Sequence, residues 1–260
     1  MRRTFVAAVL LLSGLTTAHA AMQAKPVEWK VGKDTFSGYL VYDDTNAIKR
    51  PGLVMVPDWK GVTDNAVAKA KHIAGDDYVV LVADMYGKGV RPKDDAEAQA
   101  QVKKLYADRT VLRARANKAL DVLKTAKDVP LDTEHLGALG YCFGGATVLE
   151  LARSGADIDA AVTFHGGLAT DMPAKPGTVK ASVLVLNGAD DQGTKADIPA
   201  FENEMNAAKV DWQFVNFSGA VHCFALPEAN KPPGCLYNEL ATRRSERMMR
   251  VFFAERFTPM

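Results

Sequence analysis

The chain has 260 residues, of which 48% are hydrophobic and 24% charged, and this composition excludes a disordered chain, a collagen-like chain and a small disulfide scaffold. Its 32 lysine and arginine residues nearly balance its 31 aspartate and glutamate residues, which gives a formal net charge of +1. No overall positive charge is therefore present to attract nucleic acid or an anionic membrane surface. We expect a globular protein that has no nucleic-acid partner.

The first twenty residues have the pattern of a secretory signal peptide. Two arginines precede an apolar run over residues 5–15, and the small-x-small sequence Ala18-His19-Ala20 follows it. The run is too short to cross a bilayer, and no later segment reaches about eighteen uninterrupted apolar residues. We therefore expect residues 1–20 to be removed on export to a bacterial periplasm, and residues 21–260 to form a protein without a membrane span.

Hydrophobic patterning after the signal predicts one α/β domain. Residues 27–42 alternate apolar and polar side chains, which indicates an antiparallel hairpin at a sheet edge. Short runs rich in valine and leucine are typical of strands buried on both faces, and they lie at 52–56, 78–83, 136–141, 160–164, 182–186 and 212–217. Apolar residues at three- and four-residue spacing predict helices at 65–74, 94–106, 112–127, 144–152, 198–208 and 238–257. This alternation predicts a mostly parallel central sheet flanked by helices.

A strand-to-helix junction carries the most specific motif of the chain. Gly140-Tyr141-Cys142-Phe143-Gly144 reads Gly-x-Cys-x-Gly, the pattern of a nucleophile elbow with sulfur in place of oxygen. Such an elbow is a strained turn in which side chains two residues from the nucleophile would collide with backbone, and glycine removes those collisions. The helix that follows would favour the thiolate form of Cys142. The alternative, a buried structural cysteine, is the commoner role of one cysteine considered alone.

Two further loops supply the partners that such a nucleophile needs. Asp190 and Asp191 follow the next-to-last predicted strand, and His222 follows the last one. The order nucleophile, acid, histidine is that of hydrolases built on this architecture. We assign Asp191 as the acid because it completes Gly-x-x-Asp, and we expect Asp190 to cap the turn. The sequence therefore predicts Cys142 as nucleophile, His222 as general base and Asp191 as the residue that orients the imidazole.

On these motifs the chain resembles the dienelactone hydrolase family over nearly all of residues 21–260. The elbow is the most specific match, and the other matching segments are Ala83-Asp84-Met85-Tyr86-Gly87, Gly188-Ala189-Asp190-Asp191 and His222-Cys223-Phe224. The resemblance implies an α/β-hydrolase fold and the Cys-Asp-His triad. It also implies a monomeric enzyme that needs no cofactor and opens enol-lactones or related carboxylic esters, so the expected partner is a small-molecule ester or lactone.

Three positions depart from the family pattern. Asp58 stands where the family has a glutamate that pairs with the resting thiol. Lys88 and Leu226 stand where the dienelactone enzymes have two arginines that hold the substrate carboxylate. Lysine lacks the bidentate fork of arginine, and leucine carries no charge. We therefore expect neutral esters to be preferred over carboxylated lactones.

The backbone and the aromatic side chains near the elbow complete the predicted site. The N–H groups of Phe143 and Trp59 would form the oxyanion hole, because one follows the nucleophile and the other follows the first parallel strand. Trp59, Tyr86, Phe143 and Phe224 would line an apolar pocket, although packing in the core explains any one of them equally well. His165 follows a predicted strand but has no acid close in sequence, so we do not assign it as a second base.

The spacing of histidines and cysteines bears on metal binding and on disulfide pairing. No histidine has metal-ligand spacing with cysteine or carboxylate, so no metal site is predicted. With three cysteines, Cys223 and Cys235 either form a disulfide that leaves Cys142 free or both stay reduced, and the sequence leaves both alternatives open. Two other functions also stay open: a thioesterase acting on another acyl compound, and a ligand-binding relic of the hydrolase fold that has lost turnover.

Overall fold

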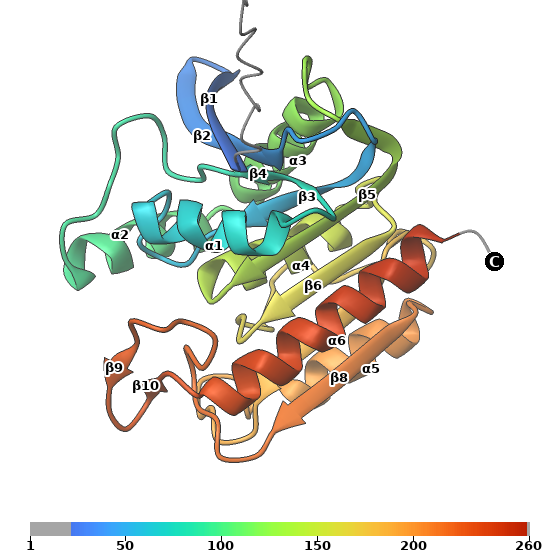
Figure 1. The fold of residues 1–260 in the computed structure, drawn as a ribbon. Coiled ribbons are helices and arrows are strands. Elements are labelled where there is room, and N and C mark those ends of the chain that lie inside the picture. The colour runs from blue at the N-terminus through green and yellow to red at the C-terminus, as the bar shows by residue number, and fades with distance from the viewer. Residues whose placement is uncertain (1–21, 259–260) are drawn as a thin grey trace, which may run out of the picture.

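Eight strands form one mixed sheet in the computed structural model, which describes residues 22–258 (Figure 1). The strands are β1 (Met22–Val31), β2 (Asp34–Asp43), β3 (Arg50–Val56), β4 (Val79–Val82), β5 (Leu131–Tyr141), β6 (Ala160–Phe164), β7 (Ser182–Gly188) and β8 (Trp212–Phe217). Their order across the sheet is β1-β2-β4-β3-β5-β6-β7-β8. The predicted signal peptide, residues 1–20, lies outside the described residues.

The direction of the strands confirms the predicted sheet. Strands β3 to β8 run parallel to one another, whereas β1 pairs antiparallel with β2, and β2 antiparallel with β4. The antiparallel hairpin therefore lies at one edge of an otherwise parallel sheet. Because parallel strands all end on the same side, the loops after β3, β5, β6, β7 and β8 gather at one edge, which is where ligands bind in open α/β sheets.

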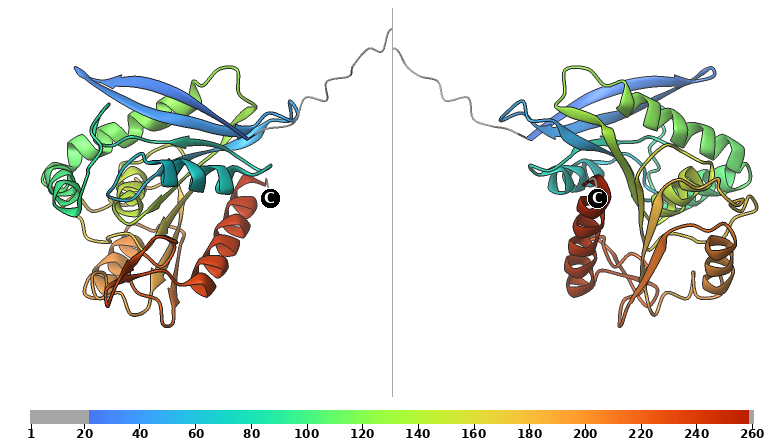
Figure 2. Two further views of the ribbon diagram at one scale, coloured as in Figure 1. Left: turned by 60° about the vertical axis from the view of Figure 1, so that its left-hand side comes forward. Right: turned by 90° about the vertical axis from the view of Figure 1, so that its right-hand side faces the viewer.

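Helices cover both faces of the sheet (Figure 2). They are α1 (Asp64–Ala74), α2 (Asp95–Tyr106), α3 (Arg109–Lys124), α4 (Phe143–Arg153), α5 (Ile198–Ala207) and α6 (Glu239–Phe257). The apolar run of strand β3 is continuous because both of its faces are buried. Leu53 and Met55 pack against α1 and α6 on one face, while Val54 and Val56 pack against α3 and α4 on the other. None of the described helices is long and apolar enough to cross a membrane.

The structure differs from the sequence prediction mainly at element boundaries. Strand β5 begins at Leu131, five residues before the predicted start, because Arg50 pairs with Leu131 before a shift in register. Helix α3 begins at Arg109, since the side chain of Asp108 accepts a hydrogen bond from the N–H of Val111 and caps it there. A small hairpin of β9 (Asn230–Lys231) and β10 (Cys235–Leu236) was not predicted.

Candidate active site

The turn between β5 and α4 has the backbone that an elbow requires. Cys142 has backbone angles of φ 54° and ψ −117°, a conformation that residues other than glycine rarely adopt. A Cβ atom at Gly140 would collide with the backbone of Gly144, and one at Gly144 would collide with the backbone of Val56. Both flanking glycines are therefore required by sterics, and Cys142 is held partly exposed at the N-terminus of α4.

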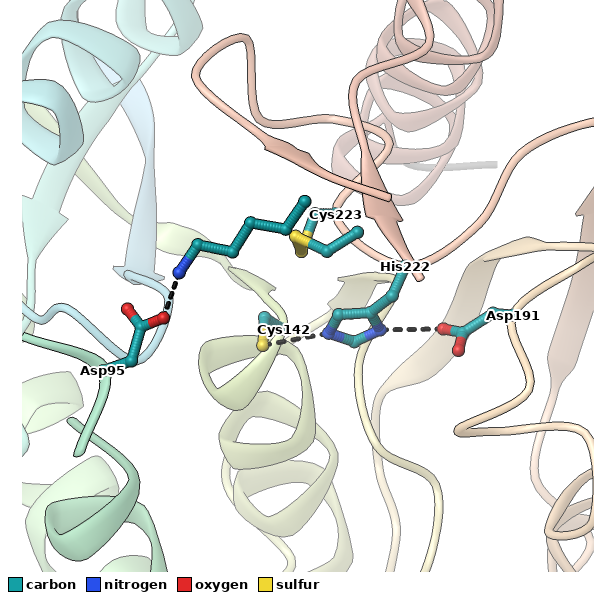
Figure 3. The surroundings of a disulfide bond; sticks show 7 residues. Asp95, Cys142, Asp191, His222 and Cys223 are labelled. Carbon is teal, nitrogen blue, oxygen red and sulfur yellow. Dashed lines mark hydrogen bonds and ion pairs between the residues drawn. A yellow bond between two sulfur atoms is a disulfide. The ribbon is translucent and has the colours of Figure 1, made fainter. Parts of the chain in front are cut away.

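The three predicted triad residues meet at this turn (Figure 3). Nε2 of His222 lies 3.0 Å from Sγ of Cys142, and Nδ1 lies 2.7 Å from Oδ2 of Asp191. The Asp191 side chain is buried, and its other oxygen accepts a hydrogen bond of 2.9 Å from the N–H of Gly193. Asp190 is exposed and points its side chain to none of these groups. The imidazole is thus fixed between a thiol and a carboxylate.

The charge state of His222 follows from these contacts. Burial opposes a charge on the imidazole, but the hydrogen bonds to Asp191 and Cys142 outweigh burial and raise the pKa of His222 to about 10. The protonated imidazole is therefore stabilised beside the sulfur. The arrangement can supply a nucleophile and then return a proton to a leaving group.

The two residues predicted to supply the oxyanion hole follow adjacent strands of the sheet. Phe143 is the first residue of α4, so its N–H has no carbonyl partner within the helix. Trp59 follows β3, the strand next to β5 in the sheet, and its carbonyl accepts a hydrogen bond of 3.0 Å from the hydroxyl of Tyr86. Their role as oxyanion donors stays a prediction.

An aromatic wall stands beside the elbow and includes one residue that the sequence did not reveal. The ring of Tyr86 stacks on Phe143 with centroids 5.5 Å apart, and Tyr106 packs on Phe143 at 5.8 Å. Burial, with the nearby charge of Cys142, raises the pKa of both tyrosines well above the ordinary value, so both phenols stay protonated. Tyr106 ends α2, and no local motif marks it.

Two predicted pocket residues lie elsewhere. The ammonium of Lys88 lies 2.8 Å from a carboxylate oxygen of Glu28 on the edge hairpin, and both side chains are about half exposed. Phe224 is fully buried and packs against Phe217 and His165 in the core. Lys88 therefore pairs with the edge hairpin and not with a triad residue. Phe224 packs in the core beneath the loop that carries His222.

Asp58 and Leu226 lie together in a narrow cavity that Glu228 and Lys69 also line. Asp58 accepts a hydrogen bond of 2.8 Å from the N–H of Lys60, and burial raises the pKa of this carboxyl group. The ammonium of Lys69 donates to the carbonyl of Ala225 at 2.8 Å. Asp58 therefore lies beside the position where the family arginine is replaced by leucine.

Cysteine pairing is resolved by the structure. Cys223 and Cys235 form a disulfide with Cα atoms 5.0 Å apart, and Cys142 is free. Within residues 22–258 no group of three or more histidine, cysteine or carboxylate side chains could hold a metal ion. The thiol beside His222 is therefore the free cysteine of the described chain.

The chain is similar in sequence and structure to known proteins. The sequence matches the dienelactone hydrolase family over residues 36–257. A structure named m3DLH is 38% identical, covers 92% of this chain and 100% of its own, and superposes with a TM-score of 0.85. A dienelactone hydrolase-like promiscuous phosphotriesterase from metagenomic libraries is 37% identical with the same coverage and a TM-score of 0.84. A putative carboxymethylenebutenolidase of Yersinia pestis is 25% identical over 206 residues, which is 74% of each chain.

Proposed function

The chain belongs to the dienelactone hydrolase family, and we propose that it hydrolyses carboxylic esters or lactones through a thioester on Cys142. The observation that carries this proposal is the placement of His222, with Nε2 3.0 Å from the sulfur and Nδ1 2.7 Å from Asp191. A histidine held in this way can accept a proton on one side while the carboxylate fixes its tautomer on the other. The substrate of this hydrolase family is a small molecule.

In the first half-reaction the Cys142 thiolate attacks the acyl carbon and forms a C–S bond. The carbonyl electron pair moves onto oxygen, where the N–H groups of Phe143 and Trp59 would stabilise the charge, each contributing about 3–4 kcal/mol. The C–O bond then breaks, and the His222 imidazolium gives its proton to the leaving oxygen. In a lactone the leaving oxygen is tethered to the acyl group. Ring opening therefore releases no separate alcohol, and the new hydroxyl group stays on the acyl-enzyme.

In the second half-reaction water cleaves the thioester. His222 takes a proton from the water as its oxygen attacks the acyl carbon, and the C–S bond breaks to return the thiolate. The products are a carboxylic acid and the resting pair of Cys142 and His222. Asp191 keeps Nδ1 protonated throughout both steps.

The site also fits thioesters, because the triad defines acyl transfer and leaves the leaving group open. A panel of p-nitrophenyl esters, thioesters and enol-lactones separates these substrate classes by kcat/KM, and an aryl phosphotriester belongs in it because of the phosphotriesterase among the similar structures. Mass spectrometry after rapid acid quenching should find an acyl group on Cys142 in the wild type and none in Cys142→Ala. Iodoacetamide labelling of Cys142 without turnover of any member of the panel would instead identify a ligand-binding relic.

Export and oligomeric state belong to the same proposal. We infer a periplasmic location from the signal-like residues 1–20, and a monomer from the family resemblance. Cell fractionation with N-terminal sequencing, and size-exclusion chromatography with light scattering, check the two expectations separately.

A further inference from the structure

We propose that the Cys223–Cys235 disulfide positions His222 for catalysis. The proposal rests on the triad function assigned above and goes beyond it, because it makes the activity depend on two cysteines that take no part in the chemistry. Cys223 is the residue next to His222, so the disulfide holds the chain one peptide unit away from the catalytic imidazole.

His222 is the triad member that lies farthest along the chain from its strand. Cys142 directly follows β5, and its N–H donates to the carbonyl of Phe164 at 3.0 Å. Asp191 lies three residues beyond β7, in a tight turn closed by its own N–H and the carbonyl of Gly188 at 3.1 Å. His222 lies five residues beyond the end of β8 at Phe217. Its position therefore needs support from outside the sheet.

The acid loop supports only the first half of the histidine loop. The N–H of Ala189 donates to Phe217 at 3.0 Å, and the N–H of Asp190 donates to the carbonyl of Ala220 at 2.9 Å. After Ala220 the loop makes backbone hydrogen bonds with β10 of the hairpin and with the residues directly after it. The carbonyl of His222 accepts a hydrogen bond of 3.1 Å from Leu236, and His222 pairs with Cys235 as an isolated β-bridge.

The disulfide fixes the distance between the loop that carries His222 and strand β10, the two segments that these contacts join. Cys223 has φ 65°, a left-handed conformation that turns the chain directly after His222. The disulfide joins that turn to Cys235, whose neighbour Leu236 donates to His222. Without the covalent link, the loop would be held by hydrogen bonds of 3.1 Å from Leu236 to the carbonyl of His222 and 3.0 Å from Asn238 to the carbonyl of Phe224, which also accepts from the hydroxyl of Thr242 at 2.7 Å. Of these, the Leu236 bond alone acts on the backbone of His222 itself. A displacement of about 1 Å in a catalytic group is enough to cost roughly a hundredfold in rate.

The strand that pairs with β10 in the hairpin offers a matched control. Lys231 lies opposite Cys235 there, and its ammonium forms an ion pair with Asp95 on α2 and lies over the ring of Trp59. This contact holds the hairpin but makes no hydrogen bond to His222 or to its backbone neighbours. A variant at Lys231 therefore removes a side-chain contact of the same hairpin and leaves the disulfide intact.

The test uses Cys142 as a reporter of where His222 lies, and it needs no turnover. The imidazole 3.0 Å from the sulfur activates the thiol, so iodoacetamide at pH 6 should alkylate Cys142 faster in the wild type than in a variant without this imidazole. The alkylation rate at pH 6 is measured for the wild type, His222→Ala, Cys223→Ser/Cys235→Ser and Lys231→Met. Cys142 is the free cysteine in all four proteins, so each rate reports one thiol.

We expect the alkylation rate of the double serine variant to fall toward that of His222→Ala, and Lys231→Met to keep the wild-type rate. The fall at pH 6 should be about tenfold, and kcat for a p-nitrophenyl ester should fall by at least as much. A folded double serine variant with the wild-type alkylation rate and kcat overturns the proposal. If His222→Ala itself keeps the wild-type alkylation rate, the proposed triad is what fails.

Reduction of the wild type covers the case in which the double variant does not fold. A water-soluble phosphine, oxidised to its oxide with oxygen from water, converts the disulfide to two thiols. The alkylation rate of the Cys142 peptide is then followed by mass spectrometry before and after reduction. A rate that falls on reduction supports the positioning role, and one that stays constant contradicts it.

Discussion

Asp191 and His222 are joined through one carboxylate oxygen, with Oδ2 2.7 Å from Nδ1, while the other oxygen is held by the N–H of Gly193 at 2.9 Å. The carboxylate therefore cannot rotate without losing both partners, and it is almost fully buried. Its neighbour Asp190 is exposed. Two adjacent aspartates in one turn thus have separate roles, one facing the imidazole and one facing solvent.

Asp191→Asn should lower kcat/KM far more than Asp190→Asn. An asparagine at 191 keeps the shape of the side chain but can present N–H to Nδ1 and so stabilise the wrong tautomer, which in a triad costs up to roughly 10⁴-fold. Asp190→Asn should change the rate by less than about threefold, because exposed substitutions of this kind have small effects. Steady-state hydrolysis of a p-nitrophenyl ester measures both, and similar losses in the two variants would contradict the assignment.

Cys142→Ala and His222→Ala should each remove ester hydrolysis, and the double variant should be no slower than either. The sulfur and Nε2 are 3.0 Å apart and act as one unit, so removing one partner already disables the other. The rates are compared by kcat/KM on one ester at one pH, with circular dichroism as the check on folding. A double variant that is much slower than both single variants would show that the two residues act independently.

The parallel core could be predicted because each strand is buried on both faces. Leu53, Val54, Met55 and Val56 form one continuous apolar run whose alternate side chains enter different core layers. The meeting of Cys142, Asp191 and His222 follows from that topology, since the loops after β5, β7 and β8 all lie at the same edge.

The residues that escaped prediction depend on contacts between distant segments. Tyr106 reaches Phe143 only because α2 packs beside the elbow, and nothing within its own helix marks it. Lys88 directly follows the matching segment that ends at Gly87, but Glu28 on the β1–β2 hairpin lies beside it in the fold and forms an ion pair with its ammonium. The hairpin of β9 and β10 has two residues in each strand, too few for an alternating pattern.

Asp58→Asn should stabilise the folded protein at neutral pH. Burial raises the pKa of Asp58 in the folded state above its unfolded value of 3.8, so its stabilising contribution is present below about pH 3.8 and is lost as pH rises through the folded pKa. Asparagine avoids the cost of a buried charge and still accepts the hydrogen bond from the N–H of Lys60.

Thermal unfolding from pH 3.5 to pH 8 tests this prediction. The melting temperature of Asp58→Asn should exceed that of the wild type at pH 7, and the difference should shrink as pH falls toward about 3.8. Asp190→Asn, which alters an exposed carboxylate, should follow the wild type at every pH. A difference for Asp58→Asn that stays constant with pH would mean that ionisation of this group is not the cause.

The cations near the site are engaged with protein groups, which bears on the charge of the substrate. Lys88 pairs with Glu28 at 2.8 Å, and Lys60 and Lys231 both pair with Asp95. The ammonium of Lys69 donates to a backbone carbonyl in the loop after His222. At position 226, where the family has an arginine, a buried leucine lines the cavity beside Asp58.

Leu226→Arg should therefore shift the enzyme toward carboxylated substrates. The wild type should favour a neutral aryl ester over a carboxylated enol-lactone, because a charge-assisted contact contributes about 1.5–3 kcal/mol and its loss costs roughly ten- to a hundredfold in kcat/KM. Leu226→Met, neutral and of similar volume, is the control and should keep the wild-type ratio. The ratio of kcat/KM for the two substrates is compared in the three proteins. A wild type that already prefers the carboxylated lactone would show that another cation holds the substrate carboxylate.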